Sequence, residues 1–260
     1  MKRILAFLLI FVTSFSSSVG NCSEVLDKSQ AWEGRSDRAE KWFFEDLPRH
    51  IGNDFKETIW NPWHLLFLAG GSISTIGIHQ EDSKIQKDFA SRPLGKTFDD
   101  IMNIGADPLV LAGASLVTLS ISELIDAKKV AITSGTMFEA LTLTEIIALS
   151  LQFATQRTRP DGSKHSFPSG HTSGAFALAA VAETYYGPWV GIPSFALASL
   201  VGVARLDSNK HFASDVMAGA ILGTLMGLGT AKFHKKEFSN YFLVPTIHED
   251  TVEISLIRPF

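Results

Sequence analysis

The sequence has little of what several common protein classes require. Its single cysteine, Cys22, rules out an internal disulfide in this chain of 260 residues. Lys and Arg (23) do not outnumber Asp and Glu (27), and the net charge of -4 offers nucleic acid no overall basic field. Charged residues make up only 19%, against roughly 25% in typical soluble proteins. We therefore expect neither a disulfide scaffold nor a nucleic-acid partner.

The N-terminus has the pattern of an export signal. The chain begins with MKR, continues with the apolar run Ile4–Val12 and reaches the small residues Ser18 and Gly20. A basic start, a short apolar stretch and small residues before a cleavage point are typical of a secretory signal peptide. Residues 1–20 are predicted to be a signal peptide or, in the alternative reading, an uncleaved N-terminal anchor.

Long apolar segments follow, and none alternates with the period of two that a strand requires. They are rich in Ala, Leu, Gly and Ser, as closely packed helices are. Several are shorter than the roughly 20 residues of a comfortable membrane span, so a buried soluble core stays open beside the favoured membrane reading. The six predicted helices cover residues 64–78, 108–125, 132–155, 173–186, 191–206 and 214–231.

The predicted fold is all-α, a bundle of about six apolar helices that is membrane-embedded or membrane-associated. A polar and aromatic segment (21–62) is expected before the helical core (63–232), and a tail (233–260) after it. The tail should form a short C-terminal hairpin. The glycines of the last helix are expected to allow tight helix packing; they are Gly219, Gly223, Gly227 and Gly229.

Three polar segments should meet on one face of the bundle. The predicted helices 173–186 and 191–206 form a hairpin through YGPW, so the chain returns to the side that it left. The segments flanking this hairpin therefore share a face. These segments are QFATQRTRP (152–160), SFPSGH (166–171) and ARLDSNKHFASD (204–215).

The residue types on this face suit a phosphate group. Arg159 and Arg205 carry permanently charged forks that can bind phosphate through two hydrogen bonds. Ser169 can cap the helix that follows, and the free N–H groups at Gly170 would then point at an anion. Together they predict an oxyanion cradle.

Two histidines and a carboxylate supply the remaining chemistry. His211 and Asp215 are four residues apart and share a helix face, so the carboxylate could fix one ring nitrogen and leave the other free to attack. His171 lies beside the cradle as a second proton-transfer group. A nucleophile, an acid and a cradle are the parts that phosphoryl transfer needs.

RP, then PSGH, then R-x5-H-x3-D resembles the three-part signature of the type-2 phosphatidic acid phosphatase superfamily. That superfamily includes membrane lipid phosphatases, soluble class A acid phosphatases and vanadium haloperoxidases. The resemblance covers residues 152–215, and the predicted helical bundle is compatible with it. The matching residues are Arg159, Pro160, Pro168, Ser169, Gly170, His171, Arg205, His211 and Asp215.

The resemblance implies a role for each of these residues. His211 would attack phosphorus and form a phosphohistidine, Asp215 would orient His211, and His171 would protonate the leaving oxygen. The phosphate oxygens would be held by Arg159, Arg205, Ser169 and the N–H of Gly170. Neither a metal nor a cofactor is implied, and the histidines lack the Cys or HExxH spacing of a zinc site.

The chain departs from the family pattern at Gln152, where the first motif begins with Lys. A neutral amide binds phosphate more weakly than an ammonium group does. Arg157 or Lys164 could supply the missing charge, or the site could have an altered substrate or reduced activity.

We therefore expect a metal-independent phosphatase of the bacterial cell envelope, in the membrane or periplasm, with its site facing the periplasm. Its partner would be a phosphorylated lipid or a small phosphoester, as a phosphomonoester or diphosphate, with membrane lipid around it. The alternatives are a vanadate-dependent haloperoxidase and a catalytically degenerate membrane protein.

Overall fold

The computed structural model describes residues 58, 60–125, 127–239, 242–248 and 251–257. The predicted signal peptide and nearly all of the polar segment 21–62 lie outside these residues. The described helices are α4 (Pro62–His79), α5 (Asp82–Ser91), α6 (Lys96–Gly105), α7 (Pro108–Leu124), α8 (Lys128–Thr155), α9 (Gly170–Tyr186), α10 (Pro188–Asp207) and α11 (Ala213–Ser239).

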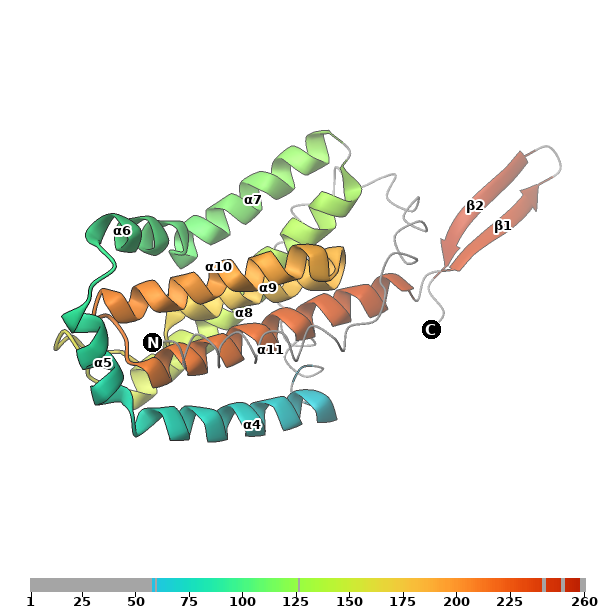
Figure 1. Cartoon of the computed structure of the whole chain (residues 1–260). Coiled ribbons are helices and arrows are strands. Elements are labelled where there is room, and N and C mark those ends of the chain that lie inside the picture. Colours follow the sequence, from blue (N-terminus) through green and yellow to red (C-terminus); the bar gives the residue numbers. More distant parts are fainter. Residues whose placement is uncertain (1–57, 59, 126, 240–241, 249–250, 258–260) are drawn as a thin grey trace.

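All six predicted apolar helices are present, and the helical fold class is confirmed (Figure 1). Two short helices, α5 and α6, were not predicted. Helix α5 has the sequence DSKIQKDFAS, in which Ile85 and Phe89 are buried against Val203 and Leu206 of α10. Two apolar residues spaced by four are enough to dock this helix of about three turns, but they form no apolar run.

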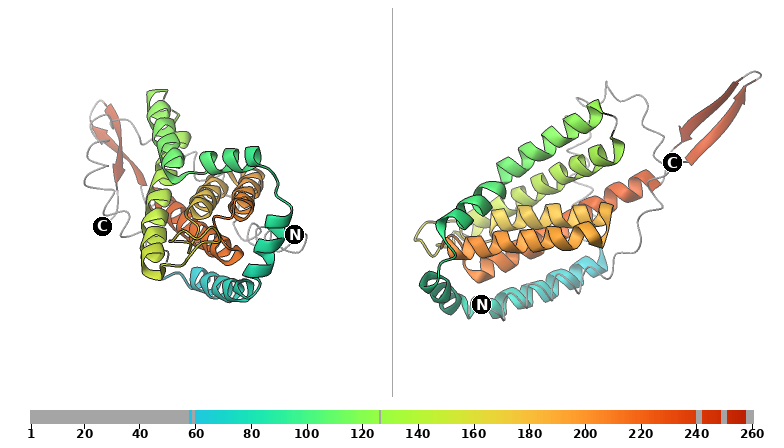
Figure 2. Two further views of the ribbon diagram at one scale, coloured as in Figure 1. Left: turned by 90° about the vertical axis from the view of Figure 1, so that its left-hand side faces the viewer. Right: turned by 45° about the horizontal axis from the view of Figure 1, so that its top comes forward.

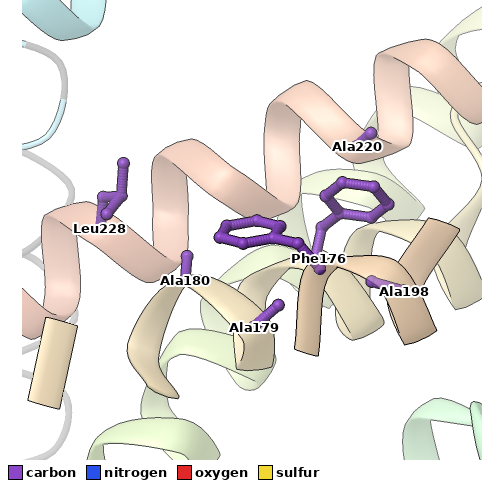
Figure 3. Close-up of a cluster of buried hydrophobic side chains, with 7 residues drawn as sticks. Phe176, Ala179, Ala180, Ala198, Ala220 and Leu228 are labelled. Atoms are coloured by element: carbon purple, nitrogen blue, oxygen red, sulfur yellow. The ribbon is translucent and has the colours of Figure 1, made fainter. Parts of the chain in front are cut away.

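Helix α9 lies at the centre of the bundle and packs against α8, α10 and α11 (Figures 1 and 2). Figure 3 shows the core cluster that these helices share, in which Phe176 of α9 lies among alanines. Its ring centroid is 5.8 Å from that of Phe195 in α10. Small neighbours let these two rings fill the space between the helices.

The prediction of tight packing by the last helix is confirmed. A Cβ built on Gly223 would lie 2.0 Å from the main-chain oxygen of Ser173, and one on Gly227 would lie 2.4 Å from that of Ala177. Only glycine permits two helix backbones to approach this closely. Gly229 instead faces Thr58, just before α4.

Three described helices are long and apolar enough to cross a membrane: Lys129–Thr155, Pro188–Asp207 and Ala213–Lys235. A fourth span is possible if α6 and α7, which meet at 51°, count as one broken span. Large apolar side chains are exposed along the outer helices, including Ile73 of α4 and Leu109 of α7. Contiguous apolar surface of this kind suits a lipid environment. The described chain thus has the helices of a membrane protein.

The predicted C-terminal hairpin is present as β1 (Phe242–His248) and β2 (Thr251–Ile257). The strands pair antiparallel, with Phe242 opposite Ile257 and His248 opposite Thr251. In Figure 1 the hairpin extends beyond the C-terminal end of α11, at the end of the bundle opposite α5.

Candidate active site

The three predicted segments meet at one end of the bundle, next to α5 (Figures 1 and 2). The long loop between α8 and α9 lies there beside the short connection from α10 to α11. Several contacts join the loop to this connection and to the start of α11. Among them, Ser169 N–H donates to the Asp215 carbonyl at 3.1 Å, and Lys210 Nζ lies 3.0 Å from Asp161 Oδ2. The expected shared face therefore exists, and the signature residues surround it.

His211 has one ring nitrogen fixed and the other available. Its side chain is buried, and Nδ1 lies 2.7 Å from the main-chain oxygen of Ser166. Because a carbonyl only accepts, Nδ1 carries the proton and the Nε2 lone pair is free. Burial, then the charges of Arg205 and Arg159, hold the pKa of His211 well below its usual 6.5. A neutral imidazole with a free Nε2 is the form that a nucleophile requires.

Asp215 is not the direct partner of the His211 ring. Its Oδ2 is 3.9 Å from Nδ1, beyond hydrogen-bond distance. Oδ2 instead accepts from the Ser166 hydroxyl at 2.5 Å and from the Phe212 N–H at 2.8 Å. Asp215 thus reaches the histidine through Ser166, whose carbonyl holds the ring.

His171 begins α9 and faces the loop that joins α6 to α7. Its Nε2 lies 3.9 Å from Asp107 Oδ2. Burial, then the charge of Arg205, lowers the pKa of His171 to about 4, while Asp107 acts in the opposite direction. The ring is therefore neutral at neutral pH until a negative charge enters the site.

The two signature arginines keep donors free. Arg205 is buried and donates from Nη1 to Asn103 Oδ1 at 2.6 Å, while Arg159 donates from Nη2 to the His165 carbonyl at 3.2 Å. Both Nε atoms are buried and have no hydrogen-bond partner in the described structure. An unpaired guanidinium N–H is costly to bury, so these donors mark a place for an anion.

The Ser169 side chain does not cap α9 as expected. Ser169 occupies the N-cap position, but its hydroxyl lies 3.0 Å from Thr172 Oγ1 and makes no bond to a backbone N–H. The helix start therefore has no side-chain cap. Its first N–H groups, beginning at Gly170, remain available to an anion.

Gln152 contacts the loop that forms the cradle. Its amide Nε2 donates to the Pro168 carbonyl at 2.9 Å, and a Cβ built on Gly170 would lie 3.7 Å from the same nitrogen. The carboxylate of Glu145 is next to it, 3.3 Å from that Cβ position. Gln152 therefore supports the loop from the side on which the family lysine would lie.

Neither suggested replacement for the lysine charge is placed to act as one. The Arg157 guanidinium pairs with the carboxylates of Asp215 and Asp82, at 2.6 and 2.8 Å. Lys164 is exposed. The suggestion that Arg157 supplies the charge is wrong, because both of its terminal nitrogens are already bound to carboxylates.

Residues 142–239 match the model of the PAP2 superfamily. This segment contains the whole signature, from Gln152 to Asp215. The chain carries a PAP2 superfamily domain.

A lipid A 1-phosphatase of Porphyromonas gingivalis is similar to part of this chain. The two are 42% identical over 80 residues, which cover 29% of this chain and 18% of the relative. The chain thus aligns with about a fifth of that relative's length.

Two solved structures also resemble the chain. LpxE of Aquifex aeolicus has 23% identity and a TM-score of 0.47, covering 58% of this chain and 94% of that one. The transmembrane PAP2 type phosphatidylglycerolphosphate phosphatase of Bacillus subtilis has 21% identity and a TM-score of 0.48, covering 66% and 96%.

Sequence reasoning missed several residues at the PAP2 site, among them Ser166, Arg157 and Asp82. Ser166 belongs to the predicted site segment 166–171, but it holds His211 through its main-chain carbonyl, which no residue type reveals. Arg157 was considered only as a phosphate ligand. Asp82 lies in α5, outside the PAP2 match, and accepts from Ser214 N–H at 2.9 Å and from its hydroxyl at 2.6 Å. No local pattern could have connected it to residues more than 70 positions away.

Among the residues that the structure describes, no group of three or more His, Cys, Asp or Glu side chains is placed to hold a metal ion. Metal independence stays a prediction, which phosphate release in the presence of a chelator would test.

Proposed function

We propose that this PAP2 domain is a metal-independent phosphatase that acts on a lipid-linked phosphomonoester or diphosphate through a phosphohistidine at His211. One observation carries the proposal. The Nδ1 of His211 is held by the Ser166 carbonyl, which leaves Nε2 free, and the ring lies within the electrostatic influence of Arg205 and Arg159, whose Nε donors are unpaired. Nucleophile and phosphate cradle thus occur together at the start of α9.

The proposed reaction has two steps. In the first, the Nε2 lone pair of His211 forms a bond to phosphorus as the bond to the leaving oxygen breaks, and that oxygen takes a proton from His171. In the second, water gives a proton to His171 and attacks phosphorus, the N–P bond breaks, and phosphate leaves. Arg159, Arg205 and the N–H of Gly170 stabilise the charge on the phosphate oxygens in both steps. The second step returns both histidines to their starting states.

A lipid substrate agrees with the surface of the bundle. Exposed apolar side chains line the helices around the site, so an acyl or prenyl tail could stay in the bilayer while its phosphate enters the cradle. The relative from Porphyromonas gingivalis is named for removing a phosphate from lipid A. We propose the same substrate class, a phosphate at the head of a lipid.

We also propose that the site faces the periplasm. The basic sequence KFHKKE (232–237) belongs to the end of α11 farthest from the site. Basic residues favour the cytoplasmic side of a membrane, which leaves the site on the other side. Labelling of single cysteines introduced beside the site, with a reagent that cannot cross the inner membrane, tests this orientation.

The test of function is phosphate release by the purified chain from lipid and soluble phosphates in EDTA, beside His211→Ala. Activity in EDTA that is lost in the variant, and inhibition by vanadate, would support the proposal. Folded protein that releases phosphate from none of them would refute it. Halide oxidation with vanadate and peroxide would instead identify a haloperoxidase.

A further inference from the structure

Arg157 lies between two buried carboxylates at the edge of the site. Its Nη1 donates to Asp215 Oδ1 at 2.6 Å and to the Ser214 hydroxyl at 2.7 Å. Its Nη2 donates to Asp82 Oδ2 at 2.8 Å. The side chains of Asp215 and Asp82 are 0% and 5% exposed. One guanidinium thus joins the start of α11 to the start of α5.

Arg157 also holds the residue that fixes the nucleophile. Its main-chain oxygen accepts the N–H of Ser166 at 2.9 Å. The Ser166 hydroxyl donates to Asp215, and the Ser166 carbonyl binds Nδ1 of His211. Arg157 therefore contacts Ser166 directly through its backbone and indirectly through Asp215.

Asp82 is built to receive this arginine. It accepts two hydrogen bonds from Ser214, and Nδ1 of His79 lies 2.8 Å from its Oδ2. Burial alone would raise its pKa, but the hydrogen bonds from Ser214, Arg157 and His79 together lower it. Asp82 is therefore an anion at neutral pH, and it orients the guanidinium whose other end neutralises Asp215.

We infer that Arg157 and Asp82 are positioning residues that act on the nucleophile through Asp215 and Ser166. The guanidinium keeps Asp215 paired and in place, Asp215 fixes Ser166, and the Ser166 carbonyl holds His211 in the tautomer with a free Nε2. Neither residue touches the phosphate. The inference rests on the proposed phosphatase reaction, but its geometry can also be tested without turnover.

Steady-state kinetics give the first test, in detergent with a substrate that the wild-type chain hydrolyses. Arg157→Gln should lower kcat about 10- to 100-fold, as small displacements of a nucleophile do, and leave KM within about twofold. Arg157→Lys should recover part of the loss because it restores a charge beside Asp215. Glu81→Gln is the matched control, since Glu81 adjoins Asp82 but, among the described residues, forms an ion pair only with the exposed Lys84. It should keep wild-type kinetics.

Coupling between the two residues gives the second test. Asp82→Asn should lower kcat about 3- to 10-fold by itself, but should add little to Arg157→Gln, because its effect passes through the arginine. Fully additive losses would overturn the inference. So would a raised KM with unchanged kcat in Arg157→Gln, since that pattern indicates a direct phosphate ligand.

The third test needs no activity. Nitrogen NMR of histidine-labelled protein should show a single His211 tautomer, protonated at Nδ1, in the wild type and in Glu81→Gln. Folded Arg157→Gln should lose that single tautomer, and an unchanged tautomer would overturn the inference. A wild-type chain without phosphatase activity would refute the proposed function, while this measurement would still decide the role of Arg157.

Discussion

Gly219 of α11 lies against the main chain of Ser169, so closely that a Cβ on the glycine would be 2.6 Å from the Ser169 carbonyl oxygen. The same carbonyl accepts the N–H of Ser173 at the start of α9. The main chain at the start of α9, which is part of the proposed phosphate site, therefore packs directly against α11. Helix packing and the shape of the site are set by one contact.

The close contacts of α11 with α9 predict that a methyl group added at one of these glycines destabilises the fold. Gly223→Ala should destabilise the fold by about 1–3 kcal/mol, because the added carbon meets a backbone oxygen that cannot move alone. Gly219→Ala should also lower activity by displacing Ser169. Gly77→Ala is the control, since nothing lies within 4 Å of its Cβ position and alanine favours a helix. Thermal unfolding in detergent compares the stability of all three variants, and phosphate release measures the activity of Gly219→Ala. Equal stability of the Gly223 and Gly77 variants would contradict the argument.

Removing the proposed acid should have an effect that depends on the leaving group. His171→Gln should slow hydrolysis of an alkyl phosphate by about 10²- to 10⁴-fold, because an alkoxide needs a proton to leave. Nitrophenyl phosphate should lose much less, since nitrophenolate leaves unprotonated. The ratio of kcat/KM for the two substrates is the measurement. Equal losses on both would assign His171 to binding instead of proton transfer.

The rate should be highest at acidic pH. His211 stays neutral well below pH 6.5 because its pKa is lowered, so acid does not switch off the nucleophile until far lower pH. His171, with a pKa of about 4 in the free protein, loses its proton as the pH rises. Arg205 and Arg159 oppose its protonation and Asp107 favours it. A profile of kcat/KM should fall from about pH 5 towards pH 9, and a rise across this range would contradict the assignment.

Gln152→Lys should raise activity, by up to roughly tenfold in kcat/KM, because a charged donor binds phosphate more strongly than an amide does. Glu145 lies close enough to orient the new ammonium group. Gln152→Met is the matched variant, as it removes the hydrogen bond to the Pro168 carbonyl without adding charge, and it should lower activity. Folded Gln152→Lys with no gain would sink the idea that the charge is missing.

Much of this site was accessible from sequence because its parts are side chains at fixed spacings. Arg159, His171 and His211 are recognisable by type, and the helical hairpin between the segments places them on one face. The partner of His211 was not accessible in this way. A main-chain oxygen has no residue type, so Ser166 gave no signal and Asp215, four residues away, was the natural choice.

The short helices show the other limit. Helix α5 is mostly polar, and its stability comes from two residues docked on α10 instead of from an apolar run. Its contact with the site depends on Asp82 meeting Ser214, a pairing across 132 positions. Pairs so far apart in sequence depend on how the helices pack, so local sequence patterns cannot predict them.

The hydrogen bonds between Asp82 and Ser214 place the N-terminal limit of the catalytic unit earlier in the chain than residue 142, where the family match begins. A segment cut at residue 142 and grafted onto another helical scaffold would carry every signature residue. It would also carry Arg157, but Nη2 would lack its Asp82 partner and could bind an incoming phosphate instead. Such a transplant would have the right side chains, and Asp215 would still pair with Nη1 of Arg157, but it would lack the Asp82 carboxylate that holds Nη2. The electrostatic surroundings of Arg157, more than homology, therefore decide which parts of this chain must be transferred together.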